Sequence, residues 1–553
     1  MNECINETMN IALDNYKNSK YYTSKQKRID FLPHNSLIIE AIWEVILPLQ
    51  SYTSIQNIGT KLGFALGFTN QLDAIKTGAE ILSLTHGNLF DLELTDTGIN
   101  IIPKITNPDK TENPSPEFQC PAKWKNNRNK YGSVIMGYQN HHDDKQGLDA
   151  LNLLQQVQWE IDPVVLTTEC PPIVQTEHDF LPTYVKFIGK PFHFIWKFDK
   201  RGRSYSHSWQ LNIQSQEYDK AILSFANQRV TKHLDNLKIA IANHAGLDKL
   251  TWDARLTWFN HQTSFSTENF AEPILGRKAI RAYERAIQNK PSGYLMGVDA
   301  TASGLQIMAA LSGCKQTAKN CNLVNNTQRV DIYSEVADQM NNLLSSDEKV
   351  TRTLVKKPVM THYYNSIDIP ETAFSPTQLN VFYSVLNNLC PGAESVMETI
   401  NHYWDSSTTC HSWVLPDGHV VKVPVSEMID CRIEIDELEH RRFTYRYNKI
   451  QPSKNFRSLA PNIIHSIDGY IAREMVRRAN KLGFELVHIH DNFLFLPDYL
   501  QIVCRLYREI MSEITNSNLL ATILSTITGQ PIVINKLSDD LHLDILTSNY
   551  MLS

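Results

Sequence analysis

The sequence predicts a helix-rich α+β fold built from several subdomains. A chain of 553 residues is too long for one ordinary hydrophobic core, so it is expected to divide into smaller units. Residues 35–100 place apolar side chains at helical spacing, whereas residues 294–299 and 486–495 are short apolar runs typical of buried strands. From about residue 185 onward, helix and strand patterns are mixed.

The composition is that of an ordinary globular protein. Hydrophobic residues make up 42% of the chain, charged residues make up 20%, and the formal net charge is −6. This negative charge argues against a protein that coats nucleic acid through bulk charge, although a local basic channel is compatible with it. The nine cysteines are scattered without a Cys-x-x-Cys pair, which disfavours a zinc site or a disulfide framework and favours a reducing compartment.

No segment predicts membrane targeting. The first twenty residues contain Glu3, Glu7 and Asp14 and lack the apolar run of a secretory signal. Every long apolar stretch is interrupted by charge or proline, so none matches the length of a bilayer span. We therefore expect a cytoplasmic protein, located in the host cytoplasm if a virus encodes it.

Three further segments predict local structure. Residues 103–145 are rich in proline and predict a long loop, and its basic stretch at 123–130 fits a solvated loop better than a phosphate contact. Residues 151–165 predict a helix that ends near Pro163. Residues 420–449 predict a β-hairpin around an acidic middle, and its basic side chains fit a nucleic-acid groove and an ordinary exposed hairpin equally well.

Asp299 ends an apolar run that predicts a buried strand. The residues that follow, 300–304, fit a turn into a helix. An Asp at a strand end is held rigidly, and the carbonyl of Ala300 is able to face the same cation. Taken alone, however, Asp299 fits a helix N-cap better.

Asp491 lies at the polar tip between two apolar stretches, which predicts a strand–turn–strand hairpin. A hard cation such as Mg²⁺ prefers this carboxylate to the imidazole of His490, so we expect His490 to support the turn. Taken alone, an ordinary turn residue is again the better interpretation of Asp491.

The segment from residue 352 to residue 364 is more specific. It places Arg352, Lys356, Met360 and Tyr364 at steps of four, which puts two cations and a phenol on one helix face. Arg binds phosphate oxygens bidentately and Lys supplies a compact charge, so this face fits a triphosphate. The alternative is an ordinary solvated basic face of a helix. Pro358 predicts a kink or a late start of the regular helix.

Ser345 and Glu348 fit a capping box just upstream of this helix. The three segments gain meaning together, because two carboxylates for divalent metal and a cationic helix for a triphosphate are what phosphoryl transfer requires.

At these residues the chain resembles the single-subunit DNA-directed RNA polymerases of bacteriophages, mitochondria and chloroplasts. Asp299 with residues 303–306 resembles the first palm motif, residues 352–364 resemble the fingers helix, and residues 490–491 resemble the last palm motif. Further blocks agree in order along the chain, at residues 199–205, 242–249, 331–333, 413–418, 460–469 and 540–550. The resemblance covers residues 185–553 well and residues 115–165 weakly.

The resemblance implies a right-hand polymerase with palm, fingers, a reduced thumb, a small antiparallel palm sheet and a mostly helical N-terminal part. It divides the chain into a shortened N-terminal domain at 1–160, a reduced thumb or connector at 161–189, the first part of the palm at 190–327, fingers at 328–465 including hairpin 420–449, and the second part of the palm with a C-terminal tail at 466–553. The implied partners are a DNA template, nascent RNA and NTPs.

The resemblance also implies a role for each site residue. Catalysis is expected from Asp299, Asp491, Lys356 and Tyr364, NTP binding from Arg352, Lys249 and Tyr333, template and hybrid binding from Arg201, Arg203 and His465, and ligation of two Mg²⁺ ions from Asp299, Asp491 and Ala300. Tyr364 is expected to sense the ribose 2′-hydroxyl.

Several departures from the family pattern bear on how synthesis starts. Asn365 stands where a glycine usually follows the tyrosine, and Ile307 replaces a common histidine. Residues 151–199 leave little room for a long thumb, and the segment before residue 115 is short for a promoter-handling domain. We therefore expect a helper protein or a single-stranded template. The alternatives are a template-dependent DNA polymerase of the same palm class and a non-catalytic nucleic-acid binder.

Overall fold

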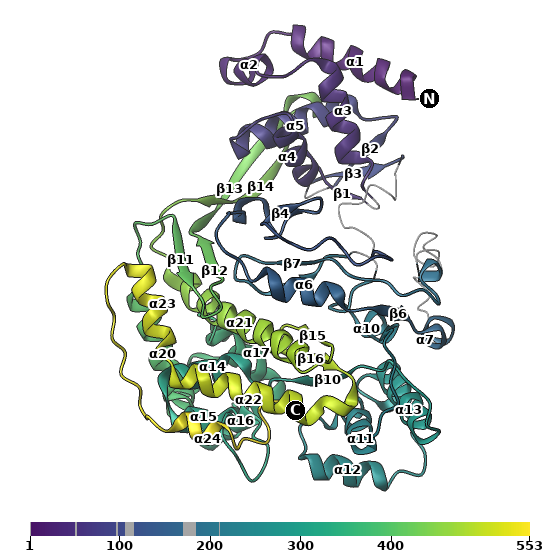
Figure 1. Ribbon diagram of the computed structural model, residues 1–553. Helices are drawn as coiled ribbons and strands as arrows, with labels where there is room; N and C mark the ends of the chain where they lie inside the picture. The colour runs from purple at the N-terminus through teal and green to yellow at the C-terminus, as the bar shows by residue number, and fades with distance from the viewer. Residues whose placement is uncertain (1, 50–51, 96–97, 106–115, 170–183, 209–210) are drawn as a thin grey trace. The chain divides into compact units, whose positions relative to one another are not determined.

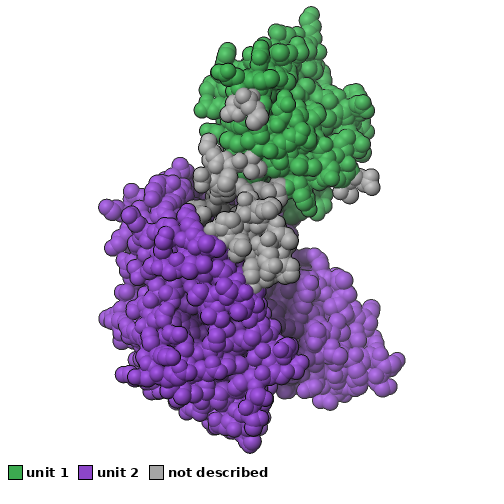
Figure 2. Space-filling view, turned by 90° about the vertical axis from the view of Figure 1, so that its right-hand side faces the viewer, with its two compact units in different colours: residues 1–114, 426–450 green, residues 115–425, 451–553 purple. Residues whose placement is uncertain are grey.

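The computed structural model describes residues 2–49, 52–95, 98–105, 116–169, 184–208 and 211–553. The chain forms two compact units (Figure 2). Unit 1 consists of residues 1–114 and 426–450, and unit 2 consists of residues 115–425 and 451–553. Across the described residues, helices outnumber the mostly short antiparallel strands, which confirms the predicted helix-rich α+β class.

Unit 1 combines five helices with two small sheets among its described residues (Figure 1). Its helices are α1 (Asn2–Asn18), α2 (Thr23–Asp30), α3 (Asn35–Ile46), α4 (Ile55–Ala65) and α5 (Gln71–Thr85). Its strands are β1 (Thr53–Ser54), β2 (Phe90–Leu94), β3 (Ile99–Pro103), β13 (Ser426–Ile435) and β14 (Arg441–Ile450). The first three strands form an antiparallel sheet in the order β1-β3-β2, and β13 pairs with β14.

The β13–β14 hairpin completes the core of unit 1. Alternate residues at its far end, Ile433 and Ile435 on β13 and Phe443 and Tyr445 on β14, are buried in one cluster with the apolar faces of the N-terminal helices. The period of two that buries one face of a strand explains this choice of residues. A segment more than 300 positions later in the sequence therefore belongs to the N-terminal core.

A buried charge cluster joins the hairpin to α2 and α5. The Lys25 ammonium is fully buried and lies 2.6 Å from Glu437, 3.1 Å from Asp436 and 3.8 Å from Glu80. Glu80 also accepts from Arg28 at 2.5 Å and from the Tyr16 hydroxyl at 2.5 Å. Buried charges are stable only when they are paired in this way, so the cluster specifies how the hairpin seats on the helices.

The predicted hairpin at 420–449 is wrong at its start. Residues 420–424 form β12, which pairs with β11 (Cys410–Val414) in unit 2, whereas the hairpin itself begins at Ser426. Its basic side chains are not all available to a partner, because Arg442 pairs with Glu434 and Arg446 pairs bidentately with Asp430 across the strands.

The first part of unit 2 differs from the expected single helix at 151–165. Helix α6 ends at Gln156, residues 159–161 form β6, and Pro163 begins α7 instead of ending a helix, with the side chain of Asp162 as its cap. Strand β6 pairs with β9, so long-range pairing overrides the helical pattern. The elements here are β4 (Arg128–Asn129), β5 (Gly132–Ser133), α6 (Leu148–Gln156), β6 (Trp159–Ile161), α7 (Pro163–Thr168), β7 (Trp196–Phe198), β8 (Ser204–Ser206), α10 (Glu217–Ala221) and β9 (Leu223–Phe225).

The centre of unit 2 is a three-stranded antiparallel sheet in the order β10-β16-β15. These strands are β10 (Met296–Asp299), β15 (Leu486–Ile489) and β16 (Asn492–Phe495). Helices α14 (Ser303–Ser312), α21 (Leu459–Lys481) and α22 (Leu500–Asn516) pack against one another, and α21 also packs on β15 (Figure 1). Both predicted strand segments and the turn into a helix after Asp299 are confirmed.

Unit 2 contains eleven further α-helices among its described residues. They are α11 (Leu234–Ala242), α12 (Trp252–Asn260), α13 (Pro273–Ile287), α15 (Lys315–Asn320), α16 (Ile332–Leu343), α17 (Arg352–His362), α18 (Asp368–Ala373), α19 (Pro376–Leu389), α20 (Pro391–His402), α23 (Leu519–Thr528) and α24 (Leu541–Ile545). Of the helices in the described ranges, none combines the length and apolarity needed to cross a bilayer.

The division into palm, fingers and thumb stays a prediction. The expected thumb or connector at 161–189 falls largely on residues 170–183, which lie outside the described residues. The proline-rich loop at 103–145 is also described only in part, and its Trp124 is buried, with its indole N–H donating to Gln155 and to the Trp196 carbonyl.

Candidate active site

One cavity of about 410 Å³ in unit 2 gathers nearly all of the predicted site residues. Strand ends, helix α17 and helix α21 each contribute side chains to it. The predicted residues that line it are Arg203, Lys249, Asp299, Ala300, Tyr333, Arg352, Lys356, Tyr364, His465 and Asp491. Arg201 is the exception: it is not part of this lining, but it contacts His465, which is.

The two strand ends place Asp299 and Asp491 next to each other. Asp299 is opposite Asn492 in the antiparallel register, and the Ala300 amide donates to the Asp491 carbonyl at 3.2 Å. His490 and Asp491 form the two-residue turn between β15 and β16, and His490 has a φ of +57°. A non-glycine residue rarely adopts the left-handed region, because this conformation is strained. Strain of this kind occurs often at functional sites, where the surrounding structure holds the turn in place.

The electrostatics of this carboxylate pair fit a divalent cation. Burial raises the pKa of Asp299 well above its usual range, and the neighbouring Asp491 raises it further. Among the described residues, neither side chain forms a hydrogen bond or an ion pair, although Arg and Lys side chains line the same cavity. Oxygen ligands without a protein counter-charge suit Mg²⁺, so Asp299, Asp491 and the Ala300 carbonyl are able to hold it.

The C-terminal segment pairs with the backbone of Asp299. Ser553 and Asp299 exchange backbone hydrogen bonds of 3.0 and 3.2 Å, and the Thr301 amide donates to the Met551 carbonyl at 3.0 Å. The Ser553 hydroxyl accepts from Arg329 at 3.1 Å. This pairing extends the sheet edge beside the Asp299 side chain and fixes the position of its backbone.

Helix α17 presents the predicted cations. It begins at Arg352 with the Thr351 side chain as its cap, so Ser345 and Glu348, which form a separate turn upstream, do not cap it as predicted. The helix continues through Pro358 to His362. The Arg352 guanidinium pairs with Asp331 and lies 5.6 Å from the centroid of the Tyr333 ring.

Tyr364 lies two residues beyond the end of α17. Its ring centroid is 4.5 Å from that of His465, and burial raises the pKa of its phenol to about 12. A Cβ on Gly304 would stand 3.4 Å from the Tyr364 hydroxyl oxygen, so glycine there leaves room beside the phenol. Asn365 has a φ of +64°, which explains why it replaces glycine, since Asn tolerates the left-handed region.

The turn at residues 199–203 contacts α21 through its two arginines. Arg201 donates to Nδ1 of His465 at 2.6 Å, and Arg203 pairs with Asp468 at 2.8 and 3.0 Å. Asp468 is almost fully buried, and burial together with Asp491 raises its pKa, while Arg203 opposes this shift. Asp468 is thus a third carboxylate near the pair and is held by a cation.

His465 is expected to make unfolding more sensitive to acid. Burial, followed by the charges of Arg203 and Arg201, lowers the pKa of His465 to about 2. Below about pH 6.5 the unfolded chain protonates this imidazole and the folded chain does not, so the group costs stability as the pH falls. When the pH is lowered from 7.5 to 5.5, the Tm of the wild type should therefore fall more than the Tm of His465→Gln. An equal fall in both Tm values would contradict the inference that His465 is neutral in the folded chain.

Sequence patterns missed several residues of this cavity. Asp248 and Asp331 lie in the same sequence blocks as the predicted Lys249 and Tyr333, so these blocks could have indicated them. Nothing in the sequence indicated Arg329 or Ser553. Asp468 was within a matching block without an assigned role, and its spacing of three from His465 on a helix was the available signal.

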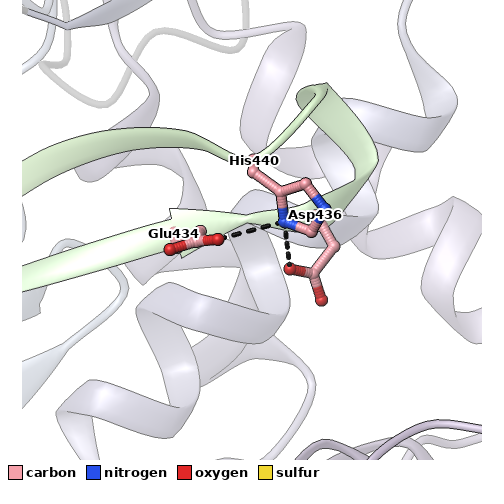
Figure 3. Close-up of side chains that lie close together, drawn as sticks. All are labelled: Glu434, Asp436 and His440. Carbon is pink, nitrogen blue, oxygen red and sulfur yellow. Dashed lines mark hydrogen bonds and ion pairs between the residues drawn. The ribbon is translucent and has the colours of Figure 1, made fainter.

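A separate cluster in unit 1 also brings together possible metal ligands. His440 Nδ1 lies 3.0 Å from Glu434 and 3.3 Å from Asp436 at the end of the hairpin (Figure 3). The second oxygen of each carboxylate already faces a cation, Arg442 for Glu434 and Lys25 for Asp436. Ion pairing accounts for this cluster, which shares no residue with the predicted magnesium ligands.

Comparison with known proteins agrees with the geometry. Residues 288–414, which include β10, α14 and α17, match the family model described as DNA-dependent RNA polymerase. The DNA-directed RNA polymerase of Pseudomonas phage phiKMV is 26% identical over 347 residues, covering 51% of this chain and 42% of the phage protein. This chain is similar to phage and organellar DNA-directed RNA polymerases.

The organellar RNA polymerases show the same relationship. The mitochondrial DNA-directed RNA polymerase of Schizosaccharomyces pombe is 28% identical, over 56% of this chain and 32% of that protein. DNA-directed RNA polymerase 1, mitochondrial, of Arabidopsis thaliana is 21% identical, over 61% of this chain and 41% of that protein. The chain thus spans less than half the length of these polymerases. Because phage, mitochondrial and chloroplastic polymerases are all among the relatives, the cytoplasmic location stays a prediction.

Among solved structures, the polymerase domain of Pol1 from M. smegmatis, in complex with DNA primer-template and dNTP, matches 40% of this chain and 36% of that chain. The sequence identity is 16% and the TM-score is 0.26, which is too low to support an argument about the fold.

Proposed function

We propose that this chain is a DNA-directed RNA polymerase that synthesises RNA from NTPs on a DNA template by two-metal-ion nucleotidyl transfer. One observation carries the proposal. A single cavity in the described part of unit 2 holds two neighbouring carboxylates without cationic partners, Asp299 and Asp491, together with cationic side chains. The relationship to RNA polymerases supports the choice of reaction.

Each side of the cavity has a part in the proposed mechanism. Asp299 and Asp491 would hold the metal, with the Ala300 carbonyl as a further ligand. Bound Mg²⁺ supplies a lowered pKa at the RNA 3′-hydroxyl and neutralises charge on the outer phosphates. Lys356 places its ammonium toward the α-phosphate, and Arg352 and Lys249 contact the β- and γ-phosphates.

Arg352 must exchange partners for this step, because its guanidinium pairs with Asp331. The ring of Tyr333, beside Arg352, supplies a flat surface next to the phosphates. Asp331 then returns the guanidinium to its starting position after pyrophosphate leaves.

Tyr364 supplies ribose selection in this proposal. Its phenol stays protonated at neutral pH, because burial raises its pKa to about 12, so it is able to donate to a 2′-hydroxyl or accept from it. A polar group buried without a partner is costly, which is how a deoxyribose is rejected. His465 supports the ring of Tyr364, and Arg203 and Arg201 lie toward the template and hybrid.

Tyr364→Phe is expected to relax discrimination between ribonucleotides and deoxynucleotides by about 10-fold or more, because one hydrogen bond to the sugar disappears. The measurement is the ratio of kcat/KM values for rNTP and dNTP on a primed scaffold. Tyr363→Phe is the matched control, since this neighbouring residue also lines the cavity but its phenol is buried beside Cys390 and Glu394. Unchanged selectivity in Tyr364→Phe would remove the sugar contact from the proposal.

A primed DNA template with Mg²⁺ tests the proposed function directly. Extension with NTPs in preference to dNTPs supports an RNA polymerase, extension with dNTPs supports a DNA polymerase, and scaffold binding without extension supports a non-catalytic binder. We further propose that initiation needs a helper protein or a single-stranded template. Efficient specific initiation by the purified chain on linear duplex DNA would contradict that dependence.

A further inference from the structure

The turn at residues 199–203 is attached to α21 by more than its two arginines. It approaches the helix along one face, formed by His465, Asp468, Gly469 and Arg473, which are spaced at i, i+3, i+4 and i+8. The first two residues of this face contact Arg201 and Arg203, as described above. The other two contact the backbone of Gly202 between those arginines.

The contact at Gly202 allows no additional atom. A Cβ on Gly469 would lie 2.7 Å from the Gly202 carbonyl oxygen, and a Cβ on Gly202 would lie 2.9 Å from Nη1 of Arg473. Gly202 also has a φ of +85°, a conformation that other residues rarely adopt. Two glycines therefore permit backbone and helix to touch at this point.

Arg473 connects this contact to a different part of unit 2. Its Nη1 donates to the Gly202 carbonyl at 2.6 Å, while Nε and Nη2 donate to the two oxygens of Asp417 at 2.7 and 3.2 Å. The Arg473 side chain is fully buried, and that of Asp417 is nearly so. A planar guanidinium is needed here, because a lysine ammonium cannot match the carboxylate fork and reach the carbonyl in one geometry.

Asp417 is itself held firmly. It accepts from Arg477 at 2.9 Å, and the backbone amide of His419 donates to it at 3.3 Å. The charges of Arg473 and Arg477 hold the pKa of Asp417 below its usual range in spite of burial. Asp417 thus stays ionised and anchors Arg473 to the turn between β11 and β12.

We propose that Arg473, anchored by Asp417, is a positioning residue that sets where Arg203, His465 and Tyr364 stand in the active-site cavity. It touches no atom of the reaction, and it acts through the Gly202 carbonyl on the turn whose arginines hold His465 and Asp468. This inference rests on the proposed function, because the result of correct positioning is efficient nucleotide addition. A displacement of about 1 Å in groups of this kind costs up to about a hundredfold in rate.

The test compares Arg473→Lys with Arg478→Lys in the full chain. Arg478 lies on the same helix and pairs bidentately with Glu513 at 2.9 and 2.5 Å, without contact to the turn. Both variants therefore lose an arginine–carboxylate fork, but only that of Arg473 is fully buried and reaches the turn. Two measurements are made on each variant: amide hydrogen exchange of residues 199–206 without substrate, and kcat and KM for single-nucleotide addition on a primed scaffold.

Arg473→Lys is expected to speed exchange in residues 199–206 by at least about tenfold and to lower kcat by about 10–100-fold, the range for lost outer-shell partners. The KM is expected to change less than about threefold. Arg478→Lys is expected to leave all three unchanged. Gly469→Ala, which displaces Gly202 from the other side, provides the same test if Arg473→Lys does not fold.

Two results would overturn the positioning role. One is exchange in residues 199–206 that matches the control, and the other is a loosened turn with unchanged kcat. Failure of the wild-type chain to extend any primer is a different result, since it contradicts the proposed polymerase activity. The exchange experiment would still decide whether Arg473 holds the turn, so the two failures are distinguishable.

Discussion

Asp299→Asn and Asp491→Asn are each expected to abolish Mg²⁺-dependent primer extension while leaving the chain folded. The amide keeps the shape of the carboxylate but removes the negative charge that the metal requires. Metal assistance supplies several kcal/mol of transition-state stabilisation, so the loss should be at least about a thousandfold in kcat. The measurement is single-nucleotide addition on a primed scaffold at saturating NTP.

The same substitutions should also raise the thermal stability of unit 2 slightly in the absence of metal, because repulsion between the two buried carboxylates disappears. Asp143→Asn is the matched control, since its side chain is 91% exposed and lies outside the cavity. Substantial Mg²⁺-dependent synthesis by either active-site variant would contradict the two-metal assignment.

Lys25→Met is expected to lower the free energy of unfolding of unit 1 by about 3–5 kcal/mol. Methionine fills similar volume, but it leaves Glu80 and Glu437 buried beside each other without the ammonium that now separates them. Removing one partner of a buried ion pair has this large cost because an uncompensated charge stays in the interior. Hydrogen exchange in residues 23–30 and 433–445 measures the loss locally.

Lys27→Met provides the control for this experiment, because Lys27 is on the same helix and is exposed. The double variant Lys25→Met with Glu437→Gln should recover part of the stability, since it removes one of the stranded carboxylates. Equal stability of Lys25→Met and Lys27→Met would mean that the buried cluster does not specify the seating of the hairpin.

Most of the residues that line the cavity could be predicted from the sequence, because they occur in or next to regular secondary structure. Asp299 ends an apolar strand, Asp491 lies in the turn between two apolar strands, and Arg352 and Lys356 share a helix face, so short-range periodicity located all four. Tyr364 lies beyond the helix end, and its position depends on the ring of His465, which is about 100 residues later. In the sequence, only the order of the family motifs along the chain indicated that Tyr364 and His465 belong to the same site.

Long-range pairing explains what the sequence concealed. Residues 159–161 have an apolar pattern compatible with a helix, and they form a strand because residues 223–225 offer a partner. In the same way, the alternation in residues 426–450 predicts strands but not the core that they join. Arg473 resembles any charged residue late in a helix, and only the folded chain shows it buried against Gly202.

The hairpin that completes unit 1 has a consequence for synthesis of the chain. Residues 1–114 leave the ribosome long before residues 426–450, which supply Ile433, Ile435, Phe443 and Tyr445 to the same core. At about 5–20 residues per second, the N-terminal helices wait tens of seconds with an incomplete apolar surface. Unit 1 thus becomes complete only after much of unit 2 has been made, which orders the assembly of the two units in time.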